Sequence, residues 1–294
     1  MWHPIHALRE TAATVMRALR ELLNQQSILR QEYEYIKNQV SLRTPGNPAL
    51  LGYKVYSQFD EDGIIAHIFS VLGDGERVFV EIGCSNGLEN NTHTLLLQGW
   101  RGAWIDADAS KINFIAKYVP ASPMLVLKQE FVSVENVEAT VSDAVSILKA
   151  KEIDFLSIDI DGDDINVLSA LLQRIKPRVI CAEYNAKFPP PMNLSIQVQE
   201  NKFWQGNDYH GASLACFTEA LGALGYVLIT CGLSGVNAFF IRNCDSAQFP
   251  AFTVEQLFQP ARYSLRRFAS GHPASLNFLA DKMSGTSRMK RAIE

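Results

Sequence analysis

The sequence predicts an α/β protein with a doubly wound, mostly parallel sheet, an antiparallel strand at one edge and a long N-terminal helix. Five short apolar runs without alternating polarity are typical of strands buried on both faces, and they lie at 77–83, 102–106, 123–129, 154–160 and 178–184. Helical segments separate these runs, at about 91–98, 110–118, 135–150 and 164–175. After a last helix at about 212–224, the runs GYVLITC and VNAFFIR are separated only by GLSG, which predicts an antiparallel hairpin.

Composition excludes several classes of protein. Of the 294 residues, 47% are apolar and 20% are charged, which indicates a globular chain and not a disordered one. The net charge of −4 argues against a nucleic-acid binder, because neutralising phosphates needs a cationic surface. The five cysteines show no CxxC spacing, which favours a reducing compartment. Charges interrupt the N-terminal segment where a signal peptide needs an apolar core, and no run of about 18 apolar residues occurs, so we expect a cytoplasmic protein without a transmembrane segment.

Residues 5–40 carry a heptad pattern. Ten of its eleven seam positions are apolar, and Gln26 is the polar one; the positions are Ile5, Leu8, Ala12, Val15, Leu19, Leu22, Gln26, Leu29, Tyr33, Ile36 and Val40. Such a seam predicts either a coiled coil that makes the protein a homo-oligomer or a long helix that packs on its own domain, and both interpretations stay open. The predicted division of the chain is a helix at 1–42, a linker at 43–56, an α/β domain at 57–245 and a C-terminal extension at 246–294, with Ser57 as the N-cap of the first helix of the domain.

The first two strands end in acidic residues beside glycines. The first continues as Glu81-Ile-Gly83-Cys-Ser-Asn-Gly87, in which the glycines let the backbone approach a ligand. This ExGxxxG loop departs from the GxGxxG loop of dinucleotide folds, and its acid repels a pyrophosphate but attracts an ammonium group. Asp106 ends the second strand, where a carboxylate either accepts hydrogen bonds from the two hydroxyls of a ribose or serves as a helix N-cap.

The fourth and fifth strands end in a cluster of acids. The string Asp159-Ile-Asp161-Gly-Asp-Asp places four carboxylates within six residues, which is costly unless something positive lies there. Glu183 and Asn185 follow the fifth strand at the same edge. Oxygen ligands of this kind suit Mg²⁺ or Mn²⁺, whereas the two later acids, Asp163 and Asp164, suit a cap for the next helix.

A loop of about 25 residues follows the fifth strand and has the length of a substrate lid. His210 lies at its end. Because the pKa of a histidine is close to neutrality, His210 is a candidate general base, and the alternative is a histidine that only packs the loop.

These strand ends resemble those of the class I S-adenosylmethionine-dependent methyltransferases. DFLSIDIDG is similar to the DFLKIDVEG segment of the FkbM-like family, and the resemblance covers about residues 55–245. It implies a Rossmann-like methyltransferase domain, with Glu81, Gly83 and Gly87 at the methionine part of the cofactor and Asp106 at the ribose. It also implies that Glu130 and Phe131 flank the adenine and that Asp159 and Asp161 face the methyl-transfer centre. The predicted cofactor-binding set is Gln58, Glu81, Gly83, Asn86, Gly87, Asp106, Ala107, Glu130, Phe131 and Asp159. Ser157 stands where the family has a lysine.

The resemblance implies O-methylation of a hydroxyl on a sugar, a polysaccharide or a related small molecule. We expect S-adenosylmethionine as cofactor, with Mg²⁺ or Mn²⁺ held by Asp159, Asp161, Glu183 and Asn185. Asp159, Asp161 and His210 are the predicted catalytic residues. Methylation of nucleic-acid amino groups is disfavoured, because DIDGDD stands where such enzymes carry an Asn/Asp-Pro-Pro-aromatic string. The alternatives are a nicotinamide-dependent oxidoreductase and a non-catalytic, oligomeric ligand-binding scaffold.

Overall fold

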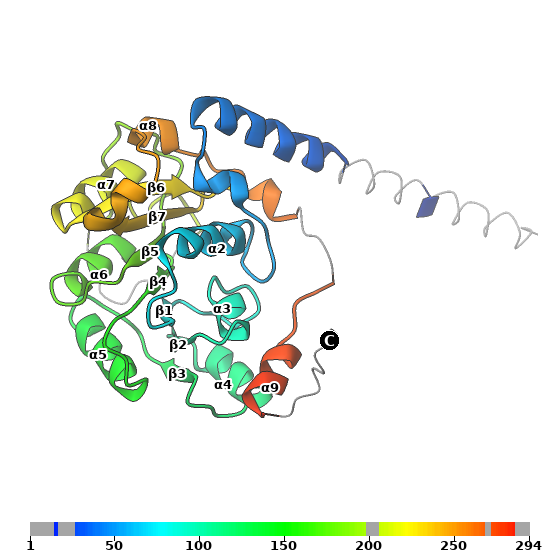
Figure 1. Cartoon of the computed structure of the whole chain (residues 1–294), viewed down its shortest axis with the longest axis vertical. Coiled ribbons are helices and arrows are strands. Elements are labelled where there is room, and N and C mark those ends of the chain that lie inside the picture. The colour runs from blue at the N-terminus through cyan, green and yellow to red at the C-terminus, as the bar shows by residue number, and fades with distance from the viewer. Residues whose placement is uncertain (1–14, 17–26, 198–205, 268–271, 286–294) are drawn as a thin grey trace, which may run out of the picture.

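The computed structural model describes residues 15–16, 27–197, 206–267 and 272–285. A seven-stranded sheet lies between two layers of helices, with α2, α3 and α4 on one face and α5, α6 and α7 on the other (Figure 1). The strands are β1 (Val78–Ile82), β2 (Arg101–Asp106), β3 (Leu125–Gln129), β4 (Phe155–Ile158), β5 (Val179–Glu183), β6 (Tyr226–Cys231) and β7 (Asn237–Arg242). The α-helices that the structure bounds are α2 (Glu61–Leu72), α3 (His93–Leu97), α4 (Ala109–Tyr118), α5 (Val137–Ile147), α6 (Asp164–Leu171), α7 (Leu214–Ala223), α8 (Val254–Leu257) and α9 (Asn277–Met283). The 3₁₀ helices are η1 (Pro48–Leu51), η2 (Asn243–Gln248) and η3 (Tyr263–Arg267).

The strand order is β3-β2-β1-β4-β5-β7-β6. The first five strands pair in parallel, and β7 pairs antiparallel with both β5 and β6. The predicted doubly wound, Rossmann-like sheet with antiparallel pairing at one edge is therefore confirmed. The reversed strand, β7, lies one place inside the edge, which β6 occupies. Between β1 and β4 the direction of winding changes, and ligands of open α/β sheets bind outside the carboxyl ends of the strands at such a point.

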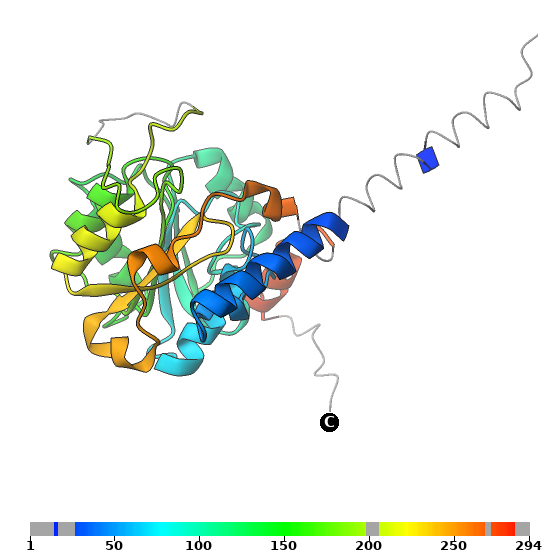
Figure 2. The same ribbon diagram turned by 90° about the horizontal axis from the view of Figure 1, so that it is seen from above.

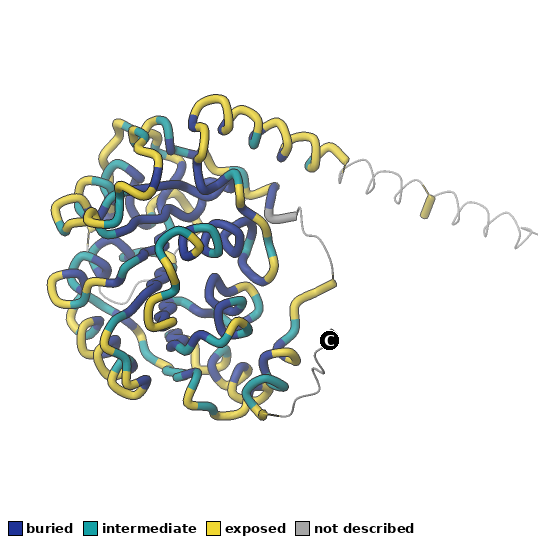
Figure 3. The backbone as a smooth tube through the Cα atoms, viewed as in Figure 1, coloured by how far each residue is buried: buried dark blue, intermediate teal, exposed yellow. Residues whose placement is uncertain are grey.

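Alternating side chains divide the core into two clusters, one on each face of the sheet. Phe79, Phe155 and Phe239 belong to the cluster under α2, α3 and α4, and their neighbours Val80 and Leu156 belong to the cluster under α5, α6 and α7. Figure 3 shows the buried chain concentrated along the strands. Because both faces are covered, the strands are continuous apolar runs, as the sequence indicates.

A helix at 27–43 runs along the outside of the domain (Figure 2). Its seam residues Tyr33, Ile36 and Val40 are buried in the first core cluster of the same chain. This part of the heptad seam therefore packs on its own domain. Most of the remaining seam, at 5–14 and 17–26, lies outside the described residues, so self-association through 5–40 stays a prediction.

The segment at 43–56 packs against the domain. Thr44, Asn47 and Ala49 are buried, and the Asn47 carboxamide oxygen accepts a hydrogen bond from the Thr230 hydroxyl on β6. The division of the chain into four parts stays a prediction. Among the described residues, no helix combines the length and the apolar character needed to cross a bilayer.

Ser57 is not the N-cap of α2, which begins at Glu61 after Asp60. One carboxylate oxygen of Asp62 accepts hydrogen bonds from the backbone N–H groups of Val55, Tyr56 and Ser57, at 2.7–2.8 Å. These three amides bend the chain before the helix, and the Ser57 hydroxyl oxygen accepts from the Asp62 backbone N–H at 3.2 Å. Ser57 therefore satisfies a donor in the first turn of α2 although it lies outside the N-cap position.

Candidate functional site

A cavity of about 580 Å³ opens at the carboxyl ends of β1, β2 and β4. This volume is within the range of small-molecule sites, roughly 300–1,000 Å³. The structure brings most of the predicted cofactor-binding residues to its wall: Gln58, Gly83, Asp106, Ala107, Glu130, Phe131 and Asp159, together with Asp161 from the predicted catalytic set. Residues far apart in the sequence therefore meet at the point where the sheet changes its direction of winding.

Asp106 is fixed at the β2 end of this cavity. Its carboxylate accepts hydrogen bonds from the backbone N–H groups of Ser85, at 2.7 Å, and Asp108, at 2.8 Å. The N-cap of α4 is Asp108, which accepts from the Ser110 amide. Asp106 is thus not the helix cap, and its remaining lone pairs are available to a hydroxyl pair such as that of a ribose.

Gly83 forms the floor of the cavity at the end of β1. Its φ is +89°, and a Cβ atom there would lie 1.7 Å from the carbonyl oxygen of Asp159. Only glycine combines this backbone conformation with such a close approach. The loop after β1 and the acidic turn after β4 are consequently held together at this point.

Glu81, Asn86 and Gly87 are not among the residues that line the cavity. The Glu81 carboxylate accepts hydrogen bonds from the backbone N–H groups of Asn91 (2.9 Å) and Thr92 (3.3 Å), from the Thr92 hydroxyl and from the Asn90 amide. These hydrogen bonds organise the segment that leads into α3, and the predicted contact of Glu81 with an ammonium group of a ligand stays a prediction.

Burial raises the pKa of the Glu81 carboxyl to about 7, against the opposing effect of its hydrogen bonds. Asn86 accepts from the Leu88 amide, and the Gly87 carbonyl bonds to Nδ1 of His93. These two residues shape the loop, and their predicted contacts with the cofactor stay a prediction.

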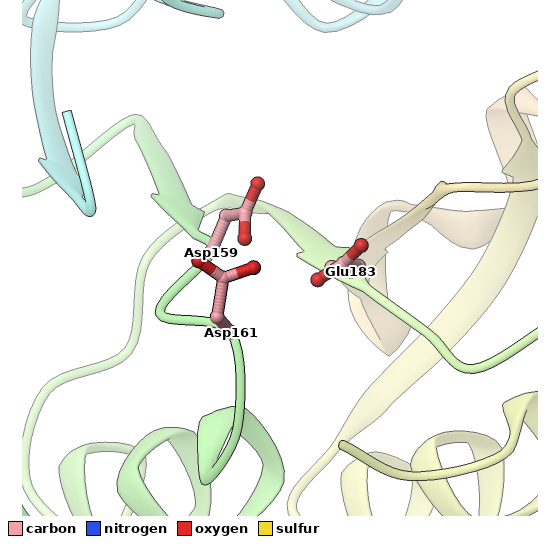
Figure 4. Close-up of side chains that lie close together, drawn as sticks. All are labelled: Asp159, Asp161 and Glu183. Atoms are coloured by element: carbon pink, nitrogen blue, oxygen red, sulfur yellow. The ribbon is translucent and has the colours of Figure 1, made fainter. Parts of the chain in front are cut away.

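The predicted metal residues Asp159, Asp161 and Glu183 meet at the ends of β4 and β5. Their carboxylates each offer an oxygen, and these oxygens all lie within 4.8 Å of one another (Figure 4). Burial and the neighbouring Asp164 and Asp161 raise the pKa of Asp159 to about 7. Burial and Asp159 raise the pKa of Glu183 well above its usual range. This spacing suits a divalent cation with oxygen ligands, because the cation offsets the repulsion among the carboxylates.

The turn that carries Asp161 is held by Asp164. Asp161 has a positive φ of 57°, which is uncommon for a residue other than glycine. The buried Asp164 carboxylate accepts from the backbone N–H groups of Ile160 (2.9 Å) and Gly162 (3.1 Å) on either side of it. Asp164 therefore fixes the turn before α6. The N-cap of α6 is Asp163, whose side chain makes no capping hydrogen bond, so neither acid caps the helix as predicted.

Asn185 holds the loop after β5. Its amide donates to the carbonyl oxygens of Asp208 and His210, both at 3.0 Å, and its carbonyl accepts from the Lys187 amide. Asn185 thus positions this loop, and its predicted role as a metal ligand stays a prediction. The described parts of this loop stand above the carboxyl edge of the sheet (Figure 2).

His210 is half-buried, on the wall of a second, smaller cavity of about 200 Å³. Burial lowers the pKa of its imidazole, and the carboxylates of Asp161 and Asp208 oppose that shift. His210 is therefore within electrostatic reach of the acid cluster and is mostly neutral at pH 7, which is the state that a general base requires.

Sequence reasoning did not identify Asp62 and Asn91 as parts of the site. Asp62 fixes the segment before Gln58, which lines the cavity. The Asn91 amide donates to the Ser157 hydroxyl at 3.0 Å, where the family pattern has a lysine. The signal was present as short polar strings, DEDG and ENNT, whose members acquire partners only in the folded chain.

No protein-family model and no curated protein matches the sequence. The chain is similar in structure to CalS10, an amino pentose methyltransferase from Micromonospora echinaspora, at TM-score 0.39 and 11% identity over 63% of this chain and 92% of that one. It is also similar to the N-terminal domain of EvdMO1 in the presence of SAH and D-fucose, at TM-score 0.41 and 14% identity over 71% and 96% of the two chains. A third similar structure is an S-adenosylmethionine-dependent methyltransferase from Clostridium acetobutylicum, at TM-score 0.40 and 9% identity over 64% and 92%. The function proposed below rests on the residues of this chain.

Proposed function

We propose that the chain is an S-adenosylmethionine-dependent O-methyltransferase, similar to the FkbM-like family, that acts on a hydroxyl of a sugar or a related small molecule. One observation carries this proposal: Asp159 and Asp161 belong at once to the wall of the large cavity and to the acid cluster. A site for a nucleoside and a site that activates a hydroxyl therefore share a boundary, as a transfer between the two requires.

The cavity residues fit the proposed cofactor. Asp106 offers carboxylate oxygens to ribose hydroxyls, Phe131 offers an aromatic wall to a base, and Gly83 leaves room for a close backbone approach. When bound, S-adenosylmethionine supplies a methyl group on a sulfonium, and transfer of that group to an acceptor oxygen leaves the neutral thioether S-adenosylhomocysteine. The carbon–oxygen bond forms as the carbon–sulfur bond breaks, and the hydroxyl proton must be removed.

The acid cluster and His210 together remove the proton of the acceptor hydroxyl. Asp159, Asp161 and Glu183 would hold Mg²⁺ or Mn²⁺, which lowers the pKa of a hydroxyl bound to it. An imidazole nitrogen of His210, kept neutral by burial, takes the proton. Asn185 holds the backbone of His210 and thereby sets the position of the base.

Calorimetry with S-adenosylhomocysteine tests cofactor binding. We expect the full chain to bind it and Asp106→Asn to bind it about tenfold to a hundredfold more weakly, because a hydrogen bond to a charged group contributes about 1.5–3 kcal/mol. Asp143→Asn is the matched control, since Asp143 on α5 is exposed and pairs with Lys128 on β3. Absence of binding by the wild type, equal affinity in the Asp106 variant, or tighter binding of a nicotinamide dinucleotide would contradict the proposal.

Titration with MnCl₂ tests the metal separately. The wild type is expected to bind about one Mn²⁺, and Asp161→Asn and Glu183→Gln are each expected to weaken binding at least about tenfold, because each removes a charged oxygen ligand. Asp245→Asn on η2 provides a surface carboxylate as control. Wild-type protein that shows no Mn²⁺ binding would remove the metal from the proposal and leave the carboxylates as the acceptor-binding groups.

We also propose a cytoplasmic location, which the free state of all five cysteines supports.

A further inference from the structure

We propose that the C-terminal extension completes the acceptor site. In this inference residues 257–265 form a strap across the carboxyl edge of the sheet, and Tyr263 on that strap packs its ring against the C–H face of a pyranose acceptor. The inference rests on the proposed function and adds to it a residue and a substrate class. It also gives the extension a role that the sequence pattern did not indicate.

The ends of the strap lie on opposite faces of the sheet. Leu257 is buried in the core cluster under α5, α6 and α7, and Leu265 is buried in the cluster under α2, α3 and α4. In Figure 2 the orange chain runs from α8 to η3 between them. A chain that joins the two clusters has to pass an edge of the sheet, and the hydrogen bonds of the strap show which edge it passes.

The strap is bound to the turn between β6 and β7, which lies at the carboxyl end of β5. The Arg262 backbone N–H donates to the Ser234 carbonyl at 2.7 Å, and the Arg262 guanidinium donates to the Leu233 carbonyl at 2.8 Å. The hydroxyl of Tyr184, directly after β5, donates to the Gln259 carbonyl at 2.6 Å. The strap therefore crosses the same edge that carries the cavity and the acid cluster.

The fit between strap and turn is close. Gly235 has a positive φ of 70°, and a Cβ atom there would lie 2.2 Å from the Pro260 carbonyl oxygen. Farther along, Leu276 packs beside Gly87 in the loop after β1, and Leu279 of α9 is fully buried. The extension is thus anchored on both sides of the site, at the β6–β7 turn and at the glycine loop.

Tyr263 follows the anchored Arg262 on the strap, at the edge of the sheet that carries the acid cluster. The turn that holds Arg262 leads into Asn237, whose register partner across the sheet is Glu183. Burial, and after it the charge of Glu183, raises the pKa of the Tyr263 phenol. Even so, 57% of the residue is exposed.

An aromatic ring packs its negative face on partially positive C–H groups, and one face of a pyranose presents such groups. The hydroxyls of the sugar remain free for polar groups, and the carboxylates at the same edge of the sheet supply these in the proposed complex.

Saturation-transfer NMR on the full chain, loaded with S-adenosylhomocysteine, tests this inference with a panel of methyl pyranosides of glucose, mannose, galactose, fucose and rhamnose. We expect transfer to the ring protons of at least one of them. Tyr263→Ala should weaken its binding about three- to tenfold, as loss of an aromatic contact implies. Tyr263→Phe should stay within about twofold of the wild type, because the ring remains. Should Tyr263→Ala fail to fold, Tyr263→Leu keeps apolar bulk without a ring.

Tyr118→Ala is the control, because Tyr118 is an exposed tyrosine at the far end of α4. Calorimetry with S-adenosylhomocysteine should give the same affinity for every variant. A wild type that binds the nucleoside but no pyranoside, or an alanine variant that binds the pyranoside as well as the wild type, overturns the role of Tyr263. A wild type that does not bind the nucleoside overturns the proposed function itself, so the two failures are distinguishable.

Discussion

Acidic residues at the two halves of the carboxyl edge have different surroundings. On the β1–β2 side, backbone amides satisfy the carboxylates: Glu81 accepts from the segment at 90–92, and Asp106 accepts from Ser85 and Asp108. On the β4–β5 side, Asp161 and Glu183 face each other and Asp159, and no backbone amide in the described part of the chain donates to their side chains. Acidic residues therefore bond to the backbone on the β1–β2 side, whereas on the β4–β5 side they lie close enough to one another to bind a cation.

This difference distinguishes acids that position the backbone from acids that can take part in the reaction. A buried carboxylate surrounded by N–H groups is stabilised by the protein itself, whereas a carboxylate surrounded by other carboxylates is stabilised by a cation or a proton. Whether an acid at a strand end can bind a ligand consequently depends on whether N–H groups of the protein already bond to its carboxylate, and not on how many acids lie there.

Asp161→Ala tests the chemical side of this comparison and has the largest expected effect. It should lower methyl transfer at least about a thousandfold, because it removes a charged ligand from the reacting centre, and leave the affinity for S-adenosylhomocysteine within about threefold. The measurement uses labelled S-adenosylmethionine and the pyranoside that the wild type binds. Normal turnover in this variant would show that the acid cluster is not the reacting centre.

Gly83→Ala tests the point where the two halves touch. The added Cβ meets the Asp159 carbonyl and strains a left-handed backbone, so the free energy of unfolding should fall by about 3 kcal/mol. Gly99→Ala is the matched control, since Gly99 has φ +94° but open space around it, and it should lose only about 1 kcal/mol. Urea denaturation measures both, and equal losses would mean that backbone strain alone accounts for the effect.

The pH dependence of Glu81 tests the positioning side. Its pKa is raised from 4.5 to about 7 in the folded chain, so the folded state binds the proton more tightly than the unfolded state. The stability contributed by protonated Glu81 is therefore present below about pH 4.5 and is lost as the pH rises through about 7. Relative to Glu81→Gln, the wild type should lose about 2–3 kcal/mol between pH 4.5 and pH 8.

Denaturation curves across this range provide the measurement. The exposed Glu89→Gln serves as the comparison, because the Glu89 carboxylate lies at the surface, 3.9 Å from the Lys54 ammonium, and should show no such trend relative to the wild type. A difference between wild type and Glu81→Gln that stays constant with pH would mean that the pKa of Glu81 is not raised by burial.

Asn185→Ala should have the smallest effect. It frees the backbone of Asp208 and His210 from their shared donor, and kcat/KM for the pyranoside should fall about tenfold while the affinity for S-adenosylhomocysteine is unchanged. Asn193→Ala removes an exposed amide that bonds to Glu219 on α7 and serves as the control. Loss of Mn²⁺ binding in the Asn185 variant would identify Asn185 as a metal ligand.

The particular successes and failures of the sequence prediction have a common cause. Asp159, Asp161 and Glu183 were predicted together because parallel strands bring their carboxyl ends to one edge, which is a consequence of topology alone. Glu81 was assigned a ligand because it also ends a strand. Its direction within the folded chain depends on the segment at 90–92, and no local pattern records that contact. The strap was not identified because Arg262 and its partners on the turn at 233–235 are about 30 residues apart in the sequence.

The sequence by itself determined the order of strands and helices, the burial of both faces of the sheet and the edge at which the acids gather. These properties follow from hydrophobic periodicity and from the geometry of parallel strands, and both act locally. Only the tertiary structure decided which acids are satisfied by backbone amides, which face one another, and where the C-terminal extension crosses the edge of the sheet. Hydrogen-bond partners are chosen by distance in the folded chain, and that distance is independent of separation along the sequence.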